Sequence, residues 1–290
     1  EQGIRGGRPP VGNRPAARRR AACPEEYRMH IVVCAKQVPN TTQVRINPET
    51  NTLVREGVES IMNPFDENAL EMALQLKERH PGTQVTVLTM GPPQAVDILK
   101  EAVGRGADEV MLLCDKAFAG SDTWATSYAL SMAIGKLPKP DLVLFGKQAI
   151  DGDTAQVGPG VADWLGMPCI TCACKIEIAG NRALVERAFE DGYEKLEVAL
   201  PCALTVLKEA NVPRMASLRG KMAAKKLQVA PTTAEMVGAD PAKLGLSASP
   251  TRVMKIFSPP PKTGGVLWQG EEPAVMAQRL VDLLRERKLI

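Results

Sequence analysis

Short apolar runs alternate with segments of helical periodicity along the first half of this chain. Four runs have the length of a buried strand: residues 30–35, 85–90, 110–114 and 142–145. Helical patterns follow them at residues 65–79, from Gly91 to about Val103, up to about Ile134, and from Val157. Successive strand–helix units of this size predict a doubly wound, mostly parallel α/β sheet with right-handed crossovers. Ligands of such sheets bind at the carboxyl ends of the strands.

The pattern changes after Pro168. Consecutive strands are predicted at residues 169–178, 182–189 and 193–199, separated by turn sequences that include Asp191-Gly192. They form an antiparallel addition to the sheet, and an apolar strand follows at 203–207. Residues 230–270 are rich in Pro, Ser and Gly, and a helix is predicted at 272–287. We therefore expect three parts: a disordered extension (1–28), an α/β nucleotide-binding domain (29–229), and a C-terminal arm that packs on a partner subunit (230–290).

Composition restricts the classes of function. The formal charge of +3 gives no reason to expect a nucleic-acid partner, and no apolar run approaches the roughly 18 residues of a membrane-spanning helix. The Arg-rich residues 1–28 lack a secretory apolar segment. This predicts a cytoplasmic protein, or one of the mitochondrial matrix if these residues are a transit peptide. A mis-assigned start is a further reading of the same segment.

Cysteine and histidine placement gives little support to a metal site or to acid–base catalysis. Seven cysteines are an odd number for a disulfide framework, and Cys34 and Cys114 lie within apolar runs. Cys169, Cys172 and Cys174 form a CxxCxC cluster without a nearby His, which favours a strand with small residues over a metal or cluster site. The sequence contains only two histidines and no G-x-S-x-G, H-E-x-x-H or G-x-G-x-x-G motif. We expect no catalytic side chain, and a bound cofactor that supplies the chemistry.

The segment from residue 141 to 166, DLVLFGKQAIDGDTAQVGPGVADWLG, is the strongest candidate site. It reads as a strand, a small-residue loop and a helix, with Thr154 or Asp153 as the candidate helix cap. Unpaired amides at a helix start attract anions, so the layout is typical of a phosphate site. An ordinary capped loop is the alternative reading. Asp151 and Asp153 would repel a phosphate, so they are expected to face a ribose, a cap or a flavin edge.

The motif GKQAIDGDTAQVGP resembles the nucleotide-binding signature of the β subunit of electron transfer flavoproteins. Other family-like segments occur in the expected order: IVVCAKQVPNT, REGVESIMNPFDENALEMALQLKE, VTVLTMGPPQAVDILKEAVGRGADEVMLL and LPCALTVLKEANVPRMASLRGKMAAKK. The resemblance runs from about Met29 to the C-terminus. It implies a sheet like that of the adenine nucleotide α-hydrolases and a heterodimer with an α subunit.

The resemblance also implies which residues bind the cofactor. Backbone groups near Ala35 and Met90 would recognise adenine, Asn63 and Asp151 would contact adenosine, and the amides of residues 152–156 with Thr154 would take phosphates. Lys36 is either a ligand or a solvated side chain. The full expected set is Cys34, Ala35, Lys36, Asn63, Met90, Gly91, Gly146, Gln148, Asp151, Gly152, Asp153, Thr154, Ala155, Gln156 and Val157.

The cofactor is expected to be FAD, with AMP as the alternative. GDTAQVGP and GLSASPTRVMKIFSPPPK resemble the electron-bifurcating branch of the family. That branch implies oxidation of NADH, with one electron passed to a low-potential acceptor such as ferredoxin and the other to the α-subunit FAD. An AMP-binding chain would be a simple carrier for acyl-CoA-type dehydrogenases. A stand-alone adenine-nucleotide-binding regulator or an ATP-pyrophosphatase-like enzyme would need an SGGxDS-type loop, which KQVPNTT is not.

LKEANVPRM resembles the loop through which the family docks a dehydrogenase or a quinone-linked oxidoreductase, which places docking near residues 208–215. Members often have Leu where this chain has Ala210, a loss of roughly 2 kcal/mol at full burial. The sequence therefore predicts a weak anchor or a different partner. A plain surface loop is the alternative.

Overall fold

The computed structural model describes residues 28–40, 60–254 and 264–290. Their contacts divide them into an α/β unit, residues 28–40 and 60–252, and a second unit, residues 253–254 and 264–290. The predicted extension lies outside the described residues except for Arg28.

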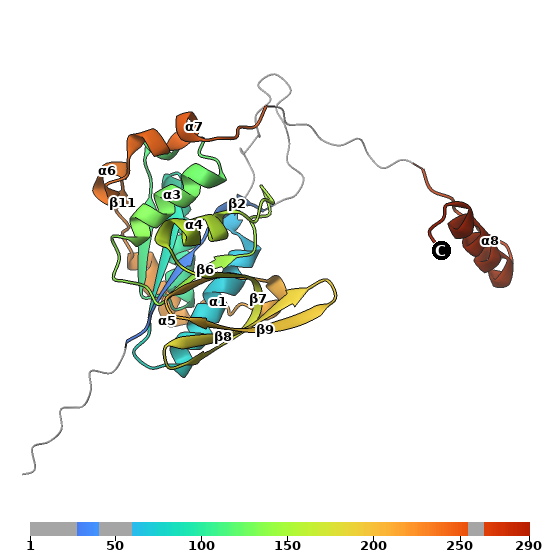
Figure 1. Cartoon of the computed structure of the whole chain (residues 1–290), viewed down its shortest axis with the longest axis horizontal. Coiled ribbons are helices and arrows are strands. Elements are labelled where there is room, and N and C mark those ends of the chain that lie inside the picture. The colour runs from blue at the N-terminus through green and yellow to red at the C-terminus, as the bar shows by residue number, and fades with distance from the viewer. Residues whose placement is uncertain (1–27, 41–59, 255–263) are drawn as a thin grey trace, which may run out of the picture. The chain divides into compact units, whose positions relative to one another are not determined.

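A nine-stranded sheet forms the centre of the α/β unit, in the order β11-β5-β4-β1-β6-β10-β7-β8-β9 (Figure 1). Its strands are β1 (His30–Cys34), β4 (Gln84–Met90), β5 (Glu109–Leu113), β6 (Leu142–Gly146), β7 (Cys169–Ala179), β8 (Arg182–Phe189), β9 (Gly192–Ala199), β10 (Cys202–Val206) and β11 (Pro231–Thr232). The strands from β11 to β7 pair in parallel, whereas β8 pairs antiparallel with both β7 and β9. This confirms the predicted doubly wound sheet and its antiparallel addition. Strands β2 (Gln37–Pro39) and β3 (Ser60–Met62) form a separate antiparallel pair.

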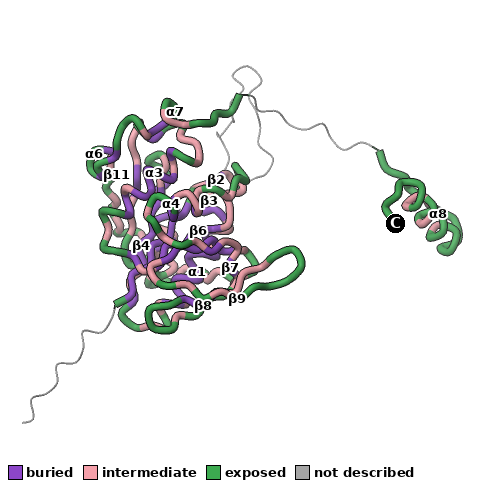
Figure 2. Tube along the Cα trace, in the orientation of Figure 1, coloured by how far each residue is buried: buried purple, intermediate pink, exposed green. Residues whose placement is uncertain are grey.

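Helices cover both faces of the sheet because successive strand residues point to opposite faces. Ile31 and Leu142 belong to one apolar cluster, while Val32 and Val143 belong to the other. The first cluster includes side chains of α1 (Pro64–Arg79) and α2 (Val96–Arg105). The second includes those of α3 (Thr123–Ile134), α4 (Val157–Leu165) and α6 (Ala234–Val237). Figure 2 shows the buried strands between these layers.

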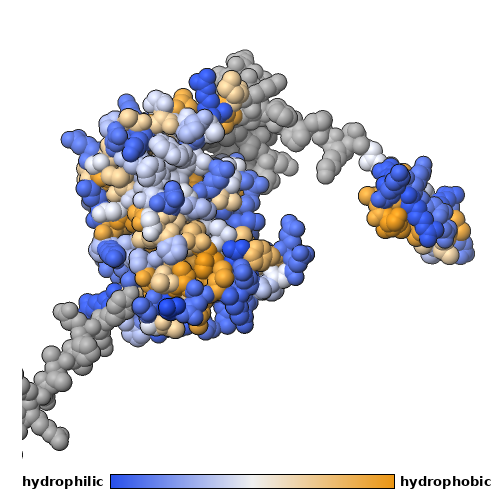
Figure 3. All heavy atoms as spheres, viewed as in Figure 1, coloured by the Kyte–Doolittle hydropathy of each residue, from blue (hydrophilic) through white to orange (hydrophobic). Residues whose placement is uncertain are grey.

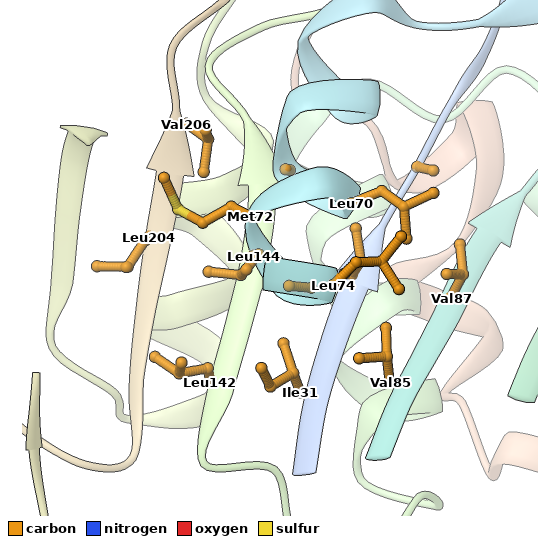
Figure 4. Packing of buried hydrophobic residues seen from close by; sticks show 14 of the residues in the cluster. Ile31, Leu70, Met72, Leu74, Val85, Val87, Leu142, Leu144, Leu204 and Val206 are labelled. Atoms are coloured by element: carbon orange, nitrogen blue, oxygen red, sulfur yellow. The ribbon is translucent and has the colours of Figure 1, made fainter. Parts of the chain in front are cut away.

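Helix α1 packs on the middle of the sheet. Figure 4 shows its Leu70, Met72 and Leu74 over strand residues that include Ile31, Leu144 and Val87. All of these side chains are at most 4% exposed. The first turn of α1 therefore lies in a fixed position beside the ends of β1 and β6.

Beyond Thr205 the chain continues to pack on the α/β unit before it enters the second unit. Helix α5 (Leu218–Lys226) contacts α2, and β11 pairs with β5. Residues 230–252 then pack on α3 through α6 and α7 (Gly245–Ala248), with Val237 and Leu244 buried. The contacts thus place residues 230–252, which the sequence assigns to the arm, with the α/β unit. Short 3-10 turns occur at η1 (Pro93–Ala95), η2 (Lys116–Phe118), η3 (Lys208–Ala210) and η4 (Pro241–Lys243).

The second unit contains α8 (Pro273–Glu286), close to the predicted helix at 272–287. No residue of α8 is buried, and its Val275 and Leu280 are 45% and 47% exposed. Figure 3 shows apolar and hydrophilic side chains next to each other on this helix. Among the described residues, no helix is both long and apolar enough to cross a membrane.

Candidate functional site

The carboxyl ends of three neighbouring strands meet at one edge of the sheet. Strand β1 ends at Cys34 and lies between β4, which ends at Met90, and β6, which ends at Gly146. Asn63 joins this edge because its amide donates to the carbonyl of Lys36 at 2.8 Å. Residues 34–36, Asn63, residues 90–91 and the loop after Gly146, which carry the expected cofactor-binding residues, are therefore neighbours in the structure.

Asn63 is the N-cap residue of α1, and its side chain supports the loop after β6. Its Nδ2 donates to the carbonyl of Gln148 at 2.9 Å, and its Oδ1 accepts from the amide of Ile150 at 3.1 Å. Pro64 follows it in the first turn, and the Asn63 side chain makes no capping hydrogen bond. Both polar ends of this buried amide bind the loop backbone instead.

Asp66 is the central residue that sequence reasoning missed. Its carboxylate accepts from the amide of Lys36 at 2.7 Å and from that of Gly146 at 3.0 Å, which joins the ends of β1 and β6. Burial raises the pKa of Asp66 to about 7, although the N–H donors and the Lys36 charge act to lower it. An acidic residue in a first helical turn is common for dipole reasons alone. The sequence therefore carries no signal that separates Asp66 from Glu67.

Only a glycine fits at position 146, because no space is left there for a side chain. A Cβ atom there would lie 2.6 Å from the Cβ of Phe65 and 2.7 Å from its carbonyl carbon, and it would also collide with Asp66 Oδ1. Real Cβ contacts are never this short, so any side chain would displace the first turn of α1. The missing side chain lets Asp66 reach the strand ends.

Lys36 is paired with Asp151. The Nζ atom of Lys36 lies 2.7 Å and 2.9 Å from the two carboxylate oxygens, in a half-exposed ion pair. Such a pair contributes about 0–1 kcal/mol to stability. Its main effect is electrostatic, because it neutralises one of the two carboxylates expected to repel a phosphate. The other, Asp153, accepts a hydrogen bond from Gln148 Nε2.

The loop from Asp151 to Gln156 is mostly exposed and has unusual backbone angles. Asp153 and Ala155 have φ of 55° and 54°, the left-handed region that non-glycine residues rarely adopt. Such residues cost on the order of 1–3 kcal/mol each and cluster at functional sites. Alternation of left-handed residues also turns successive N–H groups towards one side, as in anion-binding nests.

Helix α4 begins at Val157 without a side-chain cap. Gln156 is the N-cap residue, but its Oε1 accepts from Thr123 Oγ1 at 2.8 Å and not from α4. The predicted cap, Thr154 or Asp153, is wrong because the helix starts further along the chain than those residues can serve. Pro159 has no N–H and the Gly160 amide donates to the Gln156 carbonyl at 3.0 Å, so the amides of Val157 and Gly158 are the ones left for an external acceptor at this helix start.

The 208–215 segment is held firmly on α1. The Arg214 guanidinium donates to Glu71 at 2.8 and 3.0 Å and to Glu78 at 2.5 Å. Asn68 Nδ2 donates to the carbonyls of Lys208 and Asn211. Ala210 packs against the core, and the exposed apolar side chains are Val212 and Met215, at 88% and 86%.

The cysteines of the described residues lie in strands of the sheet or, for Cys114, directly after one. All six in the described residues are free, and Cys23 lies outside them. Burial raises the pKa of Cys34, that of Cys169 to about 11 and that of Cys202 to about 12. The CxxCxC cluster falls on β7, as the strand interpretation predicts. The described part of the chain has no group of three or more His, Cys, Asp or Glu arranged to hold a metal ion.

Comparison with known proteins shows the family of this chain. The family described as "Electron transfer flavoprotein domain" matches residues 50–236. The "Caffeyl-CoA reductase-Etf complex subunit CarD" of Acetobacterium woodii is 52% identical over 262 residues, 90% of this chain and all of the relative. "Electron transfer flavoprotein subunit beta" of Megasphaera elsdenii is 46% identical over 89% of this chain and 97% of the relative. "Protein FixA" of Azorhizobium caulinodans is 48% identical over 80% and 85%. The chain therefore belongs to the electron transfer flavoprotein family, as a β subunit.

Proposed function

We propose that this β subunit binds FAD at the carboxyl edge of β1, β4 and β6 and takes electrons there from NADH. As an electron transfer flavoprotein β subunit it pairs with an α subunit, and in this proposal it passes electrons to the α-subunit FAD and to a low-potential acceptor such as ferredoxin. The observation that carries the proposal is the uncapped start of α4 beside the exposed, left-handed loop 151–156.

The residues at this edge fit an adenine dinucleotide. A Cβ at Gly152 would meet nothing within 4 Å, so a ligand has room to approach that backbone. The N–H groups of the loop and of the first turn of α4 suit the phosphates. The Ala35 and Gly91 amides are used within the sheet, by Leu88 and Leu113. These segments would therefore contact adenine through their other backbone groups.

A flavin bound here supplies the two-electron oxidation of NADH and one-electron transfer to partners. The chain's own residues hold and orient it. Asn63 fixes the loop, Asp66 fixes the strand ends, and the Lys36–Asp151 pair reduces negative charge beside the phosphate loop. No described side chain is assigned a proton-transfer role.

Similarity to a subunit of a caffeyl-CoA reductase-Etf complex supports the bifurcating branch, for which this proposal places FAD and not AMP in the β subunit. The sequence GDTAQVGP supports the same choice. The relatives are bacterial proteins, which favours a cytoplasmic location over a mitochondrial one.

Cofactor stoichiometry tests the proposal. The αβ complex is purified and heated, and the released FAD and AMP are quantified. Two FAD per heterodimer support the proposal, whereas one FAD with one AMP supports the simple carrier for acyl-CoA-type dehydrogenases. One FAD with no second nucleotide would refute the β site altogether.

A double variant tests the site itself. Asp153→Ala with Thr154→Ala is expected to empty the β pocket, while Glu190→Ala with Asp191→Ala, in the exposed turn after β8, leaves it filled. Asp153→Asn with Thr154→Ala repeats the test with a residue that tolerates φ of 55°. Unchanged cofactor content in all variants would remove the site assignment.

The partner surfaces form the last part of the proposal. The segment 208–215 is proposed to dock a dehydrogenase or a quinone-linked oxidoreductase, supported by the exposure of Val212 and Met215 on a fixed loop. The arm that ends in α8 is proposed to pack on the α subunit, supported by the unburied apolar side chains of this helix.

A further inference from the structure

The order of the strands places a switch point between β1 and β6. From β1 the chain continues to β4 and β5 on one side, and then crosses to β6 and β10 on the other side. In open α/β sheets the crevice outside such a switch point is the usual ligand site. Amides at the strand ends there are ready donors for an anionic group.

In this chain a side chain already occupies those donors. Asp66 accepts from the amide of Lys36, two residues after the end of β1, and from that of Gly146, the last residue of β6. Asp66 is only 6% exposed, so solvent does not compete for these hydrogen bonds. The lack of space at Gly146 shows that the first turn of α1 is pressed against the strand end.

The charges around Asp66 reinforce this arrangement. Lys36, whose charge acts on Asp66, is already engaged by Asp151, and the buried Cys34 thiol also interacts electrostatically with Asp66. A phosphate of the ligand at the switch point would meet two amides that already donate to Asp66. The carboxylate of Asp66 would also lie beside the phosphate. At the start of α4 the corresponding amides carry no side-chain acceptor.

We propose that Asp66 is a positioning and specificity-determining residue that fills the anion position at the switch point. It restricts the phosphates of the cofactor to the loop and helix start at 152–157 and leaves the uncharged adenosine moiety for the switch point. The inference rests on the proposed nucleotide site and specifies how that site is oriented.

Competition between adenosine and inorganic phosphate tests the proposal on the αβ complex after removal of its cofactors. In the wild type the two ligands bind at different places, so saturating phosphate leaves the adenosine Kd unchanged. Asp66→Ala frees both strand-end amides. Phosphate then binds at the switch point, and the apparent adenosine Kd rises on the order of tenfold. A merely structural role for Asp66 would not create this competition.

Asp97→Asn is the matched control, because Asp97 is also an acidic residue in a first helical turn but is 68% exposed on α2. It should behave as the wild type. If the Asp66→Ala complex does not assemble, Asp66→Ser provides the same test with less freed space. Adenosine binding that stays insensitive to phosphate in the Asp66 variant overturns the proposal. Failure of the wild type to bind adenosine or AMP refutes the nucleotide site instead.

Discussion

Two glycines, Gly146 at the end of β6 and Gly152 within the loop that follows, permit a sharp test of how the crevice is built. In Gly146→Ala the new methyl group would lie 2.6 Å from Phe65 Cβ and 2.7 Å from its carbonyl carbon. Carbon atoms in contact are normally about 3.5–4.0 Å apart, so a displacement of about 1 Å is needed. The obstacle includes the backbone of α1, which cannot turn aside as a flexible side chain would. In Gly152→Ala the methyl group meets nothing within 4 Å.

The expected magnitudes differ accordingly. Overpacking of this kind costs about 1–3 kcal/mol, so Gly146→Ala should lower the free energy of unfolding by that amount. For a domain of about 150–250 residues each kcal/mol shifts Tm by about 2–4 °C. Gly152→Ala should stay within about 0.5 kcal/mol of the wild type. It should nevertheless lower cofactor content if the ligand approaches this part of the loop closely.

Denaturant unfolding followed by circular dichroism, on the αβ complex with and without cofactor, measures the first effect. Released nucleotide measures the second. Wild-type stability in Gly146→Ala would show that the first turn of α1 is free to move. The steric account of the Asp66 position would then be wrong.

Two other changes act through α1. Arg214→Met leaves the carboxylate of Glu71, 6% exposed, without its guanidinium partner, and should lower the free energy of unfolding by about 2–3 kcal/mol in denaturant unfolding. Arg182→Met, in an exposed pair with Glu197, should cost less than about 1 kcal/mol. Equal costs would contradict a stabilising role for the Arg214–Glu71 contact. Because the pKa of Asp66 is raised, its protonated form stabilises the fold below about pH 4, and this contribution is lost as pH rises to about 7. The stability of Asp66→Asn relative to wild type should therefore rise by about 2 kcal/mol between about pH 5 and pH 7, and parallel pH profiles would refute this ionisation.

Local patterns in the sequence predict the sheet well because its strands are continuous apolar runs and its helices are periodic. The strand at 142–145, the helix from Val157 and the Asp122 cap, which accepts from the amides of Trp124 and Ala125, all depend on neighbours in sequence. The convergence of the strand ends follows from the parallel topology. These features could be predicted without knowledge of long-range contacts.

The polar network of the site could not be predicted in the same way. Asn63 looks like a helix cap, but its partners are Gln148 and Ile150, more than 80 positions away. Asp66 joins residues 36 and 146, and only the three-dimensional arrangement shows this. Thr154 was a reasonable cap by residue type, whereas the backbone of the loop places the helix start at Val157. Local propensity thus predicts elements, and tertiary contacts decide which polar atom each side chain meets.

Helix α1 contacts both the switch point of the sheet and the 208–215 segment. Asp66 in its first turn reaches the switch point, and Asn68, Glu71 and Glu78 further along it hold the 208–215 segment. An inserted or deleted residue turns everything beyond it by about 100° and shifts it by about 1.5 Å. Such a change between positions 66 and 68 would preserve one attachment only by losing the other. The number of residues in this short stretch is consequently fixed, whereas their identity can vary.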